Sequence, residues 1–221
     1  QTYANWNSGT GERVVGLSPS TSYEMKVKAR YGQDSESGWS QVASASTAAP
    51  SFTVNFLAVS APDTIDSISV DTSSSANAIS YGSLIINTPK VAAHGITVTT
   101  NATAGYVTTL QQDGHLRTSV PDQINPVSGT NASPAAWPGA VSTGAFGYHA
   151  SDDTLCTGSG GRFVTTDTYA QLTTSPEEVA CNTGPVTGGE TNYVVYKLEV
   201  GSLQANGNYQ NVLTYITTGQ F

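Results

Sequence analysis

Side chains that could do catalytic chemistry are sparse in this sequence and stand far apart. The histidines, His94, His115 and His149, lie in three different segments. A serine hydrolase would need one of them beside a nucleophile, but the chain holds no Gly-x-Ser-x-Gly elbow. The adjacent carboxylates Glu177 and Glu178 do not suit a glycosidase, whose two carboxylates face each other across a cleft. We therefore expect a protein that is not an enzyme.

Acidic side chains that could hold a metal occur at two places. His149 is close in sequence to Asp152 and Asp153, which fits either a metal site or an exposed polar turn. Three more aspartates lie within residues 63–71 and flank a short apolar stretch. No cofactor is predicted. Calcium is the metal that this composition accommodates best, because aspartate and carbonyl oxygens are its preferred ligands.

The two cysteines of the chain are Cys156 and Cys181. No histidine stands at the spacing of a zinc ligand, so the sequence predicts a structural disulfide and no zinc site. Closing a loop of this length would stabilise the fold by about 3–4 kcal/mol in the chain-entropy model. A disulfide also indicates an oxidising, extracellular or cell-surface location.

Aromatic residues in the middle of the chain are candidates for binding. Trp137, Tyr148 and Tyr169 are predicted as a possible ligand platform, since exposed aromatic rings line many binding surfaces. The alternative is that Trp137 plugs the top of a β-sandwich. Two N-glycosylation patterns begin at Asn101 and Asn131.

The composition indicates a secreted or surface β-protein. Only 11% of the residues are charged, against about a quarter in an average domain. Residues 51–221 carry four basic and twelve acidic side chains, which accounts for the whole net charge of −8. An acidic chain lacks the Lys and Arg clusters that neutralise phosphates, so nucleic acid is not an expected partner. No apolar stretch is long enough to insert into a membrane.

The first fifty residues carry a recognisable motif. Residues 17–23 read Leu-x-Pro-x-Thr-x-Tyr, residues 23–31 alternate between apolar and charged side chains, and residues 37–40 read Ser-Gly-Trp-Ser. This arrangement, over about residues 12–47, resembles the C-terminal half of a fibronectin type III domain. The resemblance implies the last three of seven strands, within a partial sandwich at residues 1–48.

Three residues take specific roles from this resemblance. Tyr23 would form the tyrosine corner, in which its hydroxyl bonds back to the upstream backbone, with Pro19 in the turn before it. Leu17 would pack in the core. The strands missing from residues 1–11 would come from chain upstream of Gln1 or from another chain.

A second domain is expected beyond the small-residue linker that ends at Pro50. Alternating or apolar stretches predict strands over residues 51–59, 65–70, 83–87, 95–100, 106–110, 194–200 and 209–217. The glycine-bearing loop between 95–100 and 106–110 predicts a hairpin. The last two stretches are predicted as a closing pair. The sequence thus predicts an all-β fold in which residues 51–221 form a larger Ig-like β-sandwich, loosely resembling modules of bacterial surface proteins.

The middle of this domain differs from its ends. Residues 121–189 are rich in proline and glycine and hold few strong strand patterns. Long loops in a compact domain tend to be functional. We expect these loops to cover one face of the domain and to be held in place by the Cys156–Cys181 disulfide.

Two functions fit these features. The first is a non-enzymatic extracellular structural or adhesive protein, part of a bacterial cell-surface assembly such as a stalk, sheath or filament. Its partners would be further copies of itself or other surface proteins. The alternative is a carbohydrate-binding accessory module of a secreted polysaccharide-degrading enzyme, because fibronectin type III modules often link such parts.

Overall fold

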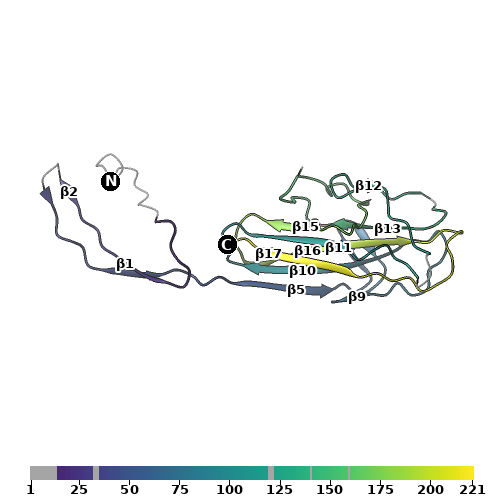
Figure 1. Ribbon diagram of the computed structural model, residues 1–221, viewed down its shortest axis with the longest axis horizontal. Coiled ribbons are helices and arrows are strands. Elements are labelled where there is room, and N and C mark those ends of the chain that lie inside the picture. Colours follow the sequence, from purple (N-terminus) through teal and green to yellow (C-terminus); the bar gives the residue numbers. More distant parts are fainter. Residues whose placement is uncertain (1–13, 32–34, 119–121, 140, 159) are drawn as a thin grey trace. The chain divides into compact units, whose positions relative to one another are not determined.

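The computed structural model describes residues 14–31, 35–118, 122–139, 141–158 and 160–221. Every regular element in these ranges is a β-strand, so the all-β prediction is confirmed. No helix in the described part of the chain is long and apolar enough to cross a membrane. The chain divides into two units, Gln1–Pro50 and Ser51–Phe221 (Figure 1).

The described part of the first unit consists of two short ladders. Strand β1 (Ser22–Met25) pairs with β4 (Ala43–Ser46), and β2 (Arg30–Tyr31) pairs with β3 (Ser35–Glu36). The strands are antiparallel and most of their side chains are exposed. Residues 12, 13 and 32–34 of the stretch for which the fibronectin type III resemblance was noted lie outside the described residues.

The tyrosine of the Leu-x-Pro-x-Thr-x-Tyr string makes the bond expected of it. The Tyr23 hydroxyl accepts a hydrogen bond of 2.8 Å from the backbone N–H of Ser18, and the carbonyl of Pro19 accepts one of 2.9 Å from the Thr21 hydroxyl. The expectation for Leu17 is wrong, because its side chain is 40% exposed. The described part of this unit has no second sheet opposite its ladders, so there is no core for this leucine to enter.

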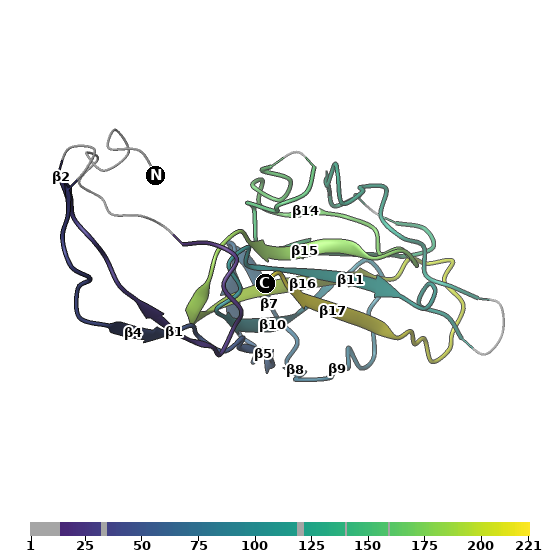
Figure 2. The same cartoon turned by 60° about the vertical axis from the view of Figure 1, so that its left-hand side comes forward.

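The second unit is built from two antiparallel sheets packed face to face (Figures 1 and 2). The four-stranded sheet has the order β13 (Ala145–Ala150), β16 (Val186–Glu199), β10 (Lys90–Thr100), β5 (Phe52–Ala58). The three-stranded sheet has the order β15 (Glu177–Asn182), β11 (Tyr106–Gln112), β17 (Leu213–Gly219). Short two-stranded ladders complete the unit: β6 (Asp63–Ile65) with β7 (Ile68–Val70), β8 (Ser74–Ser75) with β9 (Ala78–Ile79), and β12 (Ala135–Ala136) with β14 (Thr168–Tyr169).

Two cores explain why the four-stranded sheet is so apolar. Ile96 and Tyr196 point between the sheets and pack with Leu110 of the opposite sheet. On the outer face, Ala93 and Val195 pack beneath the β6–β7 hairpin and the loops beside it. Strand β10 is therefore buried on both faces over most of its length. That burial accounts for the apolar Val91-Ala92-Ala93 run near its start, which is typical of strands covered on both sides.

The predicted hairpin between residues 95–100 and 106–110 is wrong. Strands β10 and β11 form in this part of the chain, but they belong to different sheets. The five-residue link 101–105 is long enough to cross the roughly 10 Å that separates packed sheets. The predicted closing pair is wrong for the same reason, since β16 and β17 also lie in different sheets. Residues 83–87, predicted as a strand, form none.

The middle of the chain is less open than expected. Strands β13 and β15 lie within residues 121–189, and the four central residues of β15 and all of β13 are buried. Their sequences do not alternate because both of their faces are covered. Loops from the same region, with β12 among them, lie over the β13 and β15 side of the sandwich (Figure 1).

Candidate functional site

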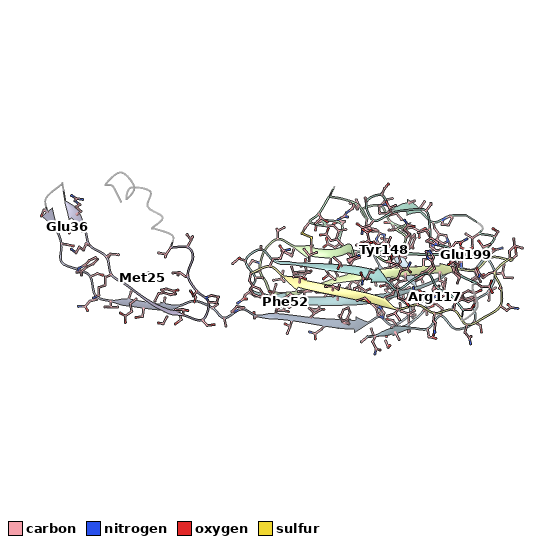
Figure 3. All side chains as sticks on the ribbon, viewed as in Figure 1. Met25, Glu36, Phe52, Arg117, Tyr148 and Glu199 are labelled. Atoms are coloured by element: carbon pink, nitrogen blue, oxygen red, sulfur yellow. A yellow bond between two sulfur atoms is a disulfide. The ribbon has the colours of Figure 1, made fainter. Side chains whose placement is uncertain are left out.

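The aromatic residues proposed as a ligand platform do not form one. Tyr148 of β13, labelled in Figure 3, and Tyr169 of β14 are fully buried, so their assignment to an exposed platform is wrong. Their hydroxyls are satisfied inside the protein: Asn131 Nδ2 donates to Tyr148 at 2.8 Å, and Tyr169 donates to Asp167 Oδ1 at 2.8 Å. A tyrosine whose hydroxyl finds such a partner contributes its whole ring to the core.

Trp137 is a packing residue, but it packs on the outer face of the four-stranded sheet and not at the top of the sandwich. Its indole Nε1 donates to Glu199 Oε2 at 2.7 Å, and its ring meets the Tyr169 ring edge-on with centroids 5.1 Å apart. The Lys197 ammonium lies 5.0 Å from the centroids of both rings and 2.9 Å from Asp167 Oδ1. These contacts close the outer core of the four-stranded sheet, so the indole is half-buried and is not free to stack on a ligand.

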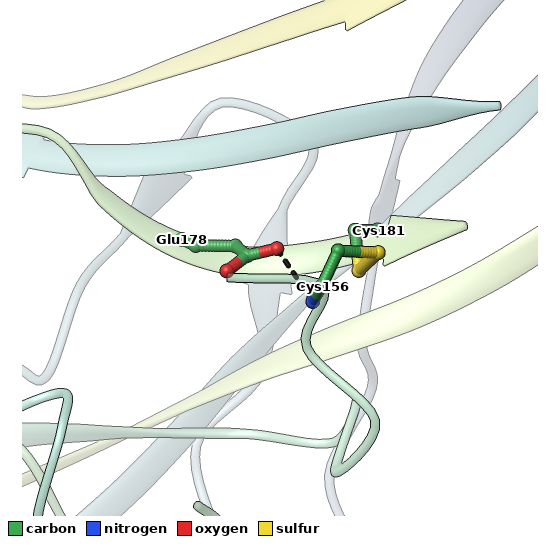
Figure 4. A group of neighbouring side chains, drawn as sticks. All are labelled: Cys156, Glu178 and Cys181. Carbon is green, nitrogen blue, oxygen red and sulfur yellow. Dashed lines mark hydrogen bonds between the residues drawn. A yellow bond between two sulfur atoms is a disulfide. The ribbon is translucent and has the colours of Figure 1, made fainter. Parts of the chain in front are cut away.

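The predicted disulfide between Cys156 and Cys181 is confirmed (Figure 4). Glu178 lies beside it, and its carboxylate accepts hydrogen bonds from the backbone N–H groups of Cys156 at 2.8 Å and Thr157 at 3.0 Å. Cys156, Glu178 and Cys181 bring two sulfurs and a carboxylate together. The sulfurs are joined in a disulfide, so neither is a thiolate that could bind a metal. The cluster attaches the loop at Cys156 and Thr157 to strand β15 and does not constitute a metal site.

A buried ion pair between Arg162 and Glu178 also holds this loop against β15. Arg162 Nη2 donates to Glu178 Oε2 at 2.8 Å, and both side chains are less than 10% exposed. The guanidinium also donates to Asn131 Oδ1 and to the Thr157 carbonyl. Asn131 is therefore buried inside a polar network, where no glycan could be attached, although it matches the glycosylation pattern.

The acidic residues considered for calcium do not converge. Asp66 Oδ2 lies 3.2 Å from His149 Nε2, while Asp71 Oδ1 accepts from the backbone N–H of Val91 at 3.1 Å. Asp152 caps its own turn and accepts from the Cys181 N–H at 2.8 Å. Within the described ranges, the Cys156–Glu178–Cys181 cluster is the one group of three metal-ligating side chains close enough to share an ion.

A large cleft, not predicted from the sequence, opens between the two sheets. It has a volume of about 1170 Å³. One wall is the segment 76–86, the other is the segment 200–215, and Phe146, Tyr196 and Leu198 of the four-stranded sheet lie between them. Pockets of a few hundred to a thousand Å³ hold small ligands in most proteins, so this cleft could take a ligand of several linked rings.

The cleft carries no formal charge. None of its lining residues is an aspartate, glutamate, lysine or arginine, although the protein as a whole is acidic. Burial lowers the pKa of His94, which lines the cleft, and so favours its neutral form. Burial likewise raises the pKa values of Tyr81, Tyr196 and Tyr215 well above their usual range, which keeps their hydroxyls protonated.

Polar groups of the cleft face solvent without partners. The side chains of Ser80, Asn206 and Asn208 are exposed and make no hydrogen bond to any described residue. Gln204 donates from Nε2 to the Tyr209 hydroxyl at 2.7 Å, whereas its buried Oε1 has no partner in the described part of the protein. The polar Asn-Gly-Asn run at 206–208 is the feature of the sequence that marks this wall of the cleft.

The edge strands on the two sides of the sandwich differ in whether other residues cover them. On one side, the edge of β13 exchanges hydrogen bonds with residues 125–127 and 170, and Asp152 covers an N–H of β15. On the other side, β5 and β17 each pair with one neighbour, and no described residue forms a ladder with their outer edges. These two edges lie together, since the rings of Phe56 and Tyr215 are 5.2 Å apart.

In comparisons with protein families, curated proteins and solved structures, nothing matches this chain.

Proposed function

We propose that this chain is a non-enzymatic extracellular protein with a structural or adhesive role in a bacterial cell-surface assembly. The observation that carries the proposal is the open side of the second unit, formed by the edges of β5 and β17. An unpaired edge offers a row of N–H and C=O groups to a strand from another chain.

Among the described residues, these edges lack the features that usually prevent pairing. Natural edge strands are commonly protected by charged residues, proline, bulges or a covering loop. Strands β5 and β17 are each seven residues long and contain no charged residue and no proline. Leu57 and Ile216, which are 38% and 46% exposed, add apolar surface along them. Such edges favour association with further copies or with other surface proteins.

Other features support the same role. The disulfide fits an oxidising environment outside the cell. No aspartate, glutamate, lysine or arginine is among the described residues that line the large cleft. Its histidine, His94, is bonded to the Ser75 carbonyl through Nε2 at 2.8 Å and has no carboxylate beside it in the cleft, which suits contact better than catalysis. The bond between Tyr23 and the Ser18 backbone supports a fibronectin type III-like first unit, and the two-sheet packing of residues 51–221 supports an Ig-like second unit.

The test compares the chain with two single variants by size-exclusion chromatography with light scattering and by negative-stain electron microscopy. Ile216→Lys places a charge on the open edge strand β17. Gln111→Lys places the same charge on β11, which is paired on both sides and cannot accept a strand. We expect the wild type and Gln111→Lys to form assemblies and Ile216→Lys to remain dispersed. A wild-type chain that stays monomeric at high concentration would refute assembly through these edges.

A further inference from the structure

We propose that the cleft between the segments 76–86 and 200–215 binds a neutral oligosaccharide. This inference goes beyond assembly at the strand edges, because it assigns a ligand to a separate feature of the second unit. It rests on three properties of the cleft: its lack of charge, its exposed amide and hydroxyl groups, and its aromatic side chains.

The lack of charge restricts the class of ligand. The second unit carries twelve acidic side chains against four basic ones, yet none of them lines the cleft. A charged ligand would leave water without meeting an opposite charge, which is costly for a buried ion. An anionic ligand would in addition be repelled by the acidic protein around the site. A neutral ligand encounters neither penalty.

The polar groups of the walls fit a ligand rich in hydroxyls. Asparagine and glutamine side chains can donate and accept at once, as a sugar hydroxyl does. Asn206 and Asn208 are exposed and make no hydrogen bond to a described residue, and Ser80, on the other wall, is exposed and uncommitted in the same way. An apolar ligand would bury these groups without partners, at a cost for each of them.

The aromatic side chains supply the other half of sugar recognition. Tyr81, Tyr209 and Tyr215 are half-buried and line the cleft, and Phe56 is 37% exposed at its edge. All three tyrosine hydroxyls are already held. Tyr81 donates to the Tyr196 carbonyl, and Tyr209 donates to the Ala205 carbonyl. The Tyr215 hydroxyl forms a hydrogen bond with the Tyr196 hydroxyl. Rings fixed in this way offer apolar faces against which the C–H face of a pyranose can pack at little entropic cost.

The ligand class is tested by isothermal titration of the full chain with short neutral oligosaccharides of glucose, xylose, mannose and N-acetylglucosamine. An oligogalacturonate of similar length serves as the acidic probe, and an uncharged peptide of alternating threonine and valine serves as the strand-like probe. We expect at least one neutral oligosaccharide to bind at least tenfold more tightly than the acidic one. Binding of the peptide alone, or of no neutral oligosaccharide at all, would overturn the proposal.

The site is tested with the double variant Asn206→Ala/Asn208→Ala. Loss of two hydrogen bonds should weaken binding by about tenfold. Asn55→Ala is the matched control, because Asn55 is an exposed asparagine without a described partner that lies outside the cleft. The melting temperature should stay unchanged in both. Equal affinity of the double variant and the control would place any sugar binding elsewhere. Assembly is measured without sugar, so failure of this proposal and failure of edge-mediated assembly are separate results.

Discussion

Replacing Glu178 with glutamine should release the loop that covers the outer face of β15. The carboxylate accepts from two backbone N–H groups, from the Thr157 hydroxyl and from Arg162. A glutamine side chain has the same shape but presents an NH₂ group in place of one oxygen. In one orientation that NH₂ faces the N–H of Cys156, and in the other it faces Thr157 and Arg162. Either orientation sets donors against donors.

The magnitude follows from the burial of the ion pair. Both side chains of the Arg162–Glu178 pair are less than 10% exposed, so solvent screens them little. Removing one partner of such a pair leaves the other charge buried and uncompensated, which typically costs about 3–5 kcal/mol. We therefore expect Glu178→Gln to lower the free energy of unfolding of the second unit by about that amount.

Urea unfolding followed by near-ultraviolet circular dichroism measures this effect, because the signal reports the fixed, buried tyrosines. Glu177→Gln is the matched control: Glu177 is the preceding residue on β15, and its carboxylate makes no hydrogen bond to a described residue. The control should change stability by less than about 0.5 kcal/mol. If Glu178→Gln cost less than about 1 kcal/mol, the network would not hold the loop in the way described, and this reasoning would be refuted.

Four further outcomes are expected. Replacing Cys156 and Cys181 by serine should lower stability by about 3–4 kcal/mol in the chain-entropy model, measured by urea unfolding, and a change below about 1 kcal/mol would argue against it. Gly105→Ala should lower the free energy of unfolding by more than about 2 kcal/mol, because φ is +76° and the new Cβ would lie 1.8 Å from the backbone oxygen of Asn182. Gly188→Ala, where a Cβ meets open space, should be nearly neutral, and thermal unfolding compares the two variants. Tyr23→Phe should speed hydrogen exchange at the backbone N–H of Ser18, because this N–H donates to the Tyr23 hydroxyl in the wild type. Unchanged exchange at Ser18 would argue against a tyrosine corner. Burial raises the pKa of the core tyrosines, so their contribution to stability is complete below about pH 10 and is lost as the pH rises further, which tyrosinate absorbance alongside unfolding would detect.

Local patterns in the sequence predicted those features of the fold, such as single strands, that depend on residues close together in the chain. The period-two alternation around Val98 and Val107 identified strands β10 and β11, because alternation reflects one buried face. The cysteine count identified the disulfide. The family resemblance carried by the Leu-x-Pro-x-Thr-x-Tyr string implied that the Tyr23 hydroxyl bonds the upstream backbone, and the hydroxyl accepts from Ser18.

Features that depend on distant segments were not predictable in this way. Alternation does not say whether the next strand pairs beside the first or crosses to the opposite sheet, so both expected pairings failed. The burial of Tyr148 depends on a hydroxyl partner, Asn131, that is supplied by a separate loop. The cleft is formed where residues 76–86 meet residues 200–215, and no local pattern brings those segments together.

Hydrogen exchange by mass spectrometry on the assembled and the dispersed chain tests the central claim most directly. If copies or partners add strands to the open side of the sandwich, the backbone amides of β5 and β17 should become protected on assembly, while those of β13 and β15, whose side is already covered by loops, should not change. Protection that appears elsewhere, with residues 52–58 and 213–219 exchanging equally fast in both states, would contradict the account.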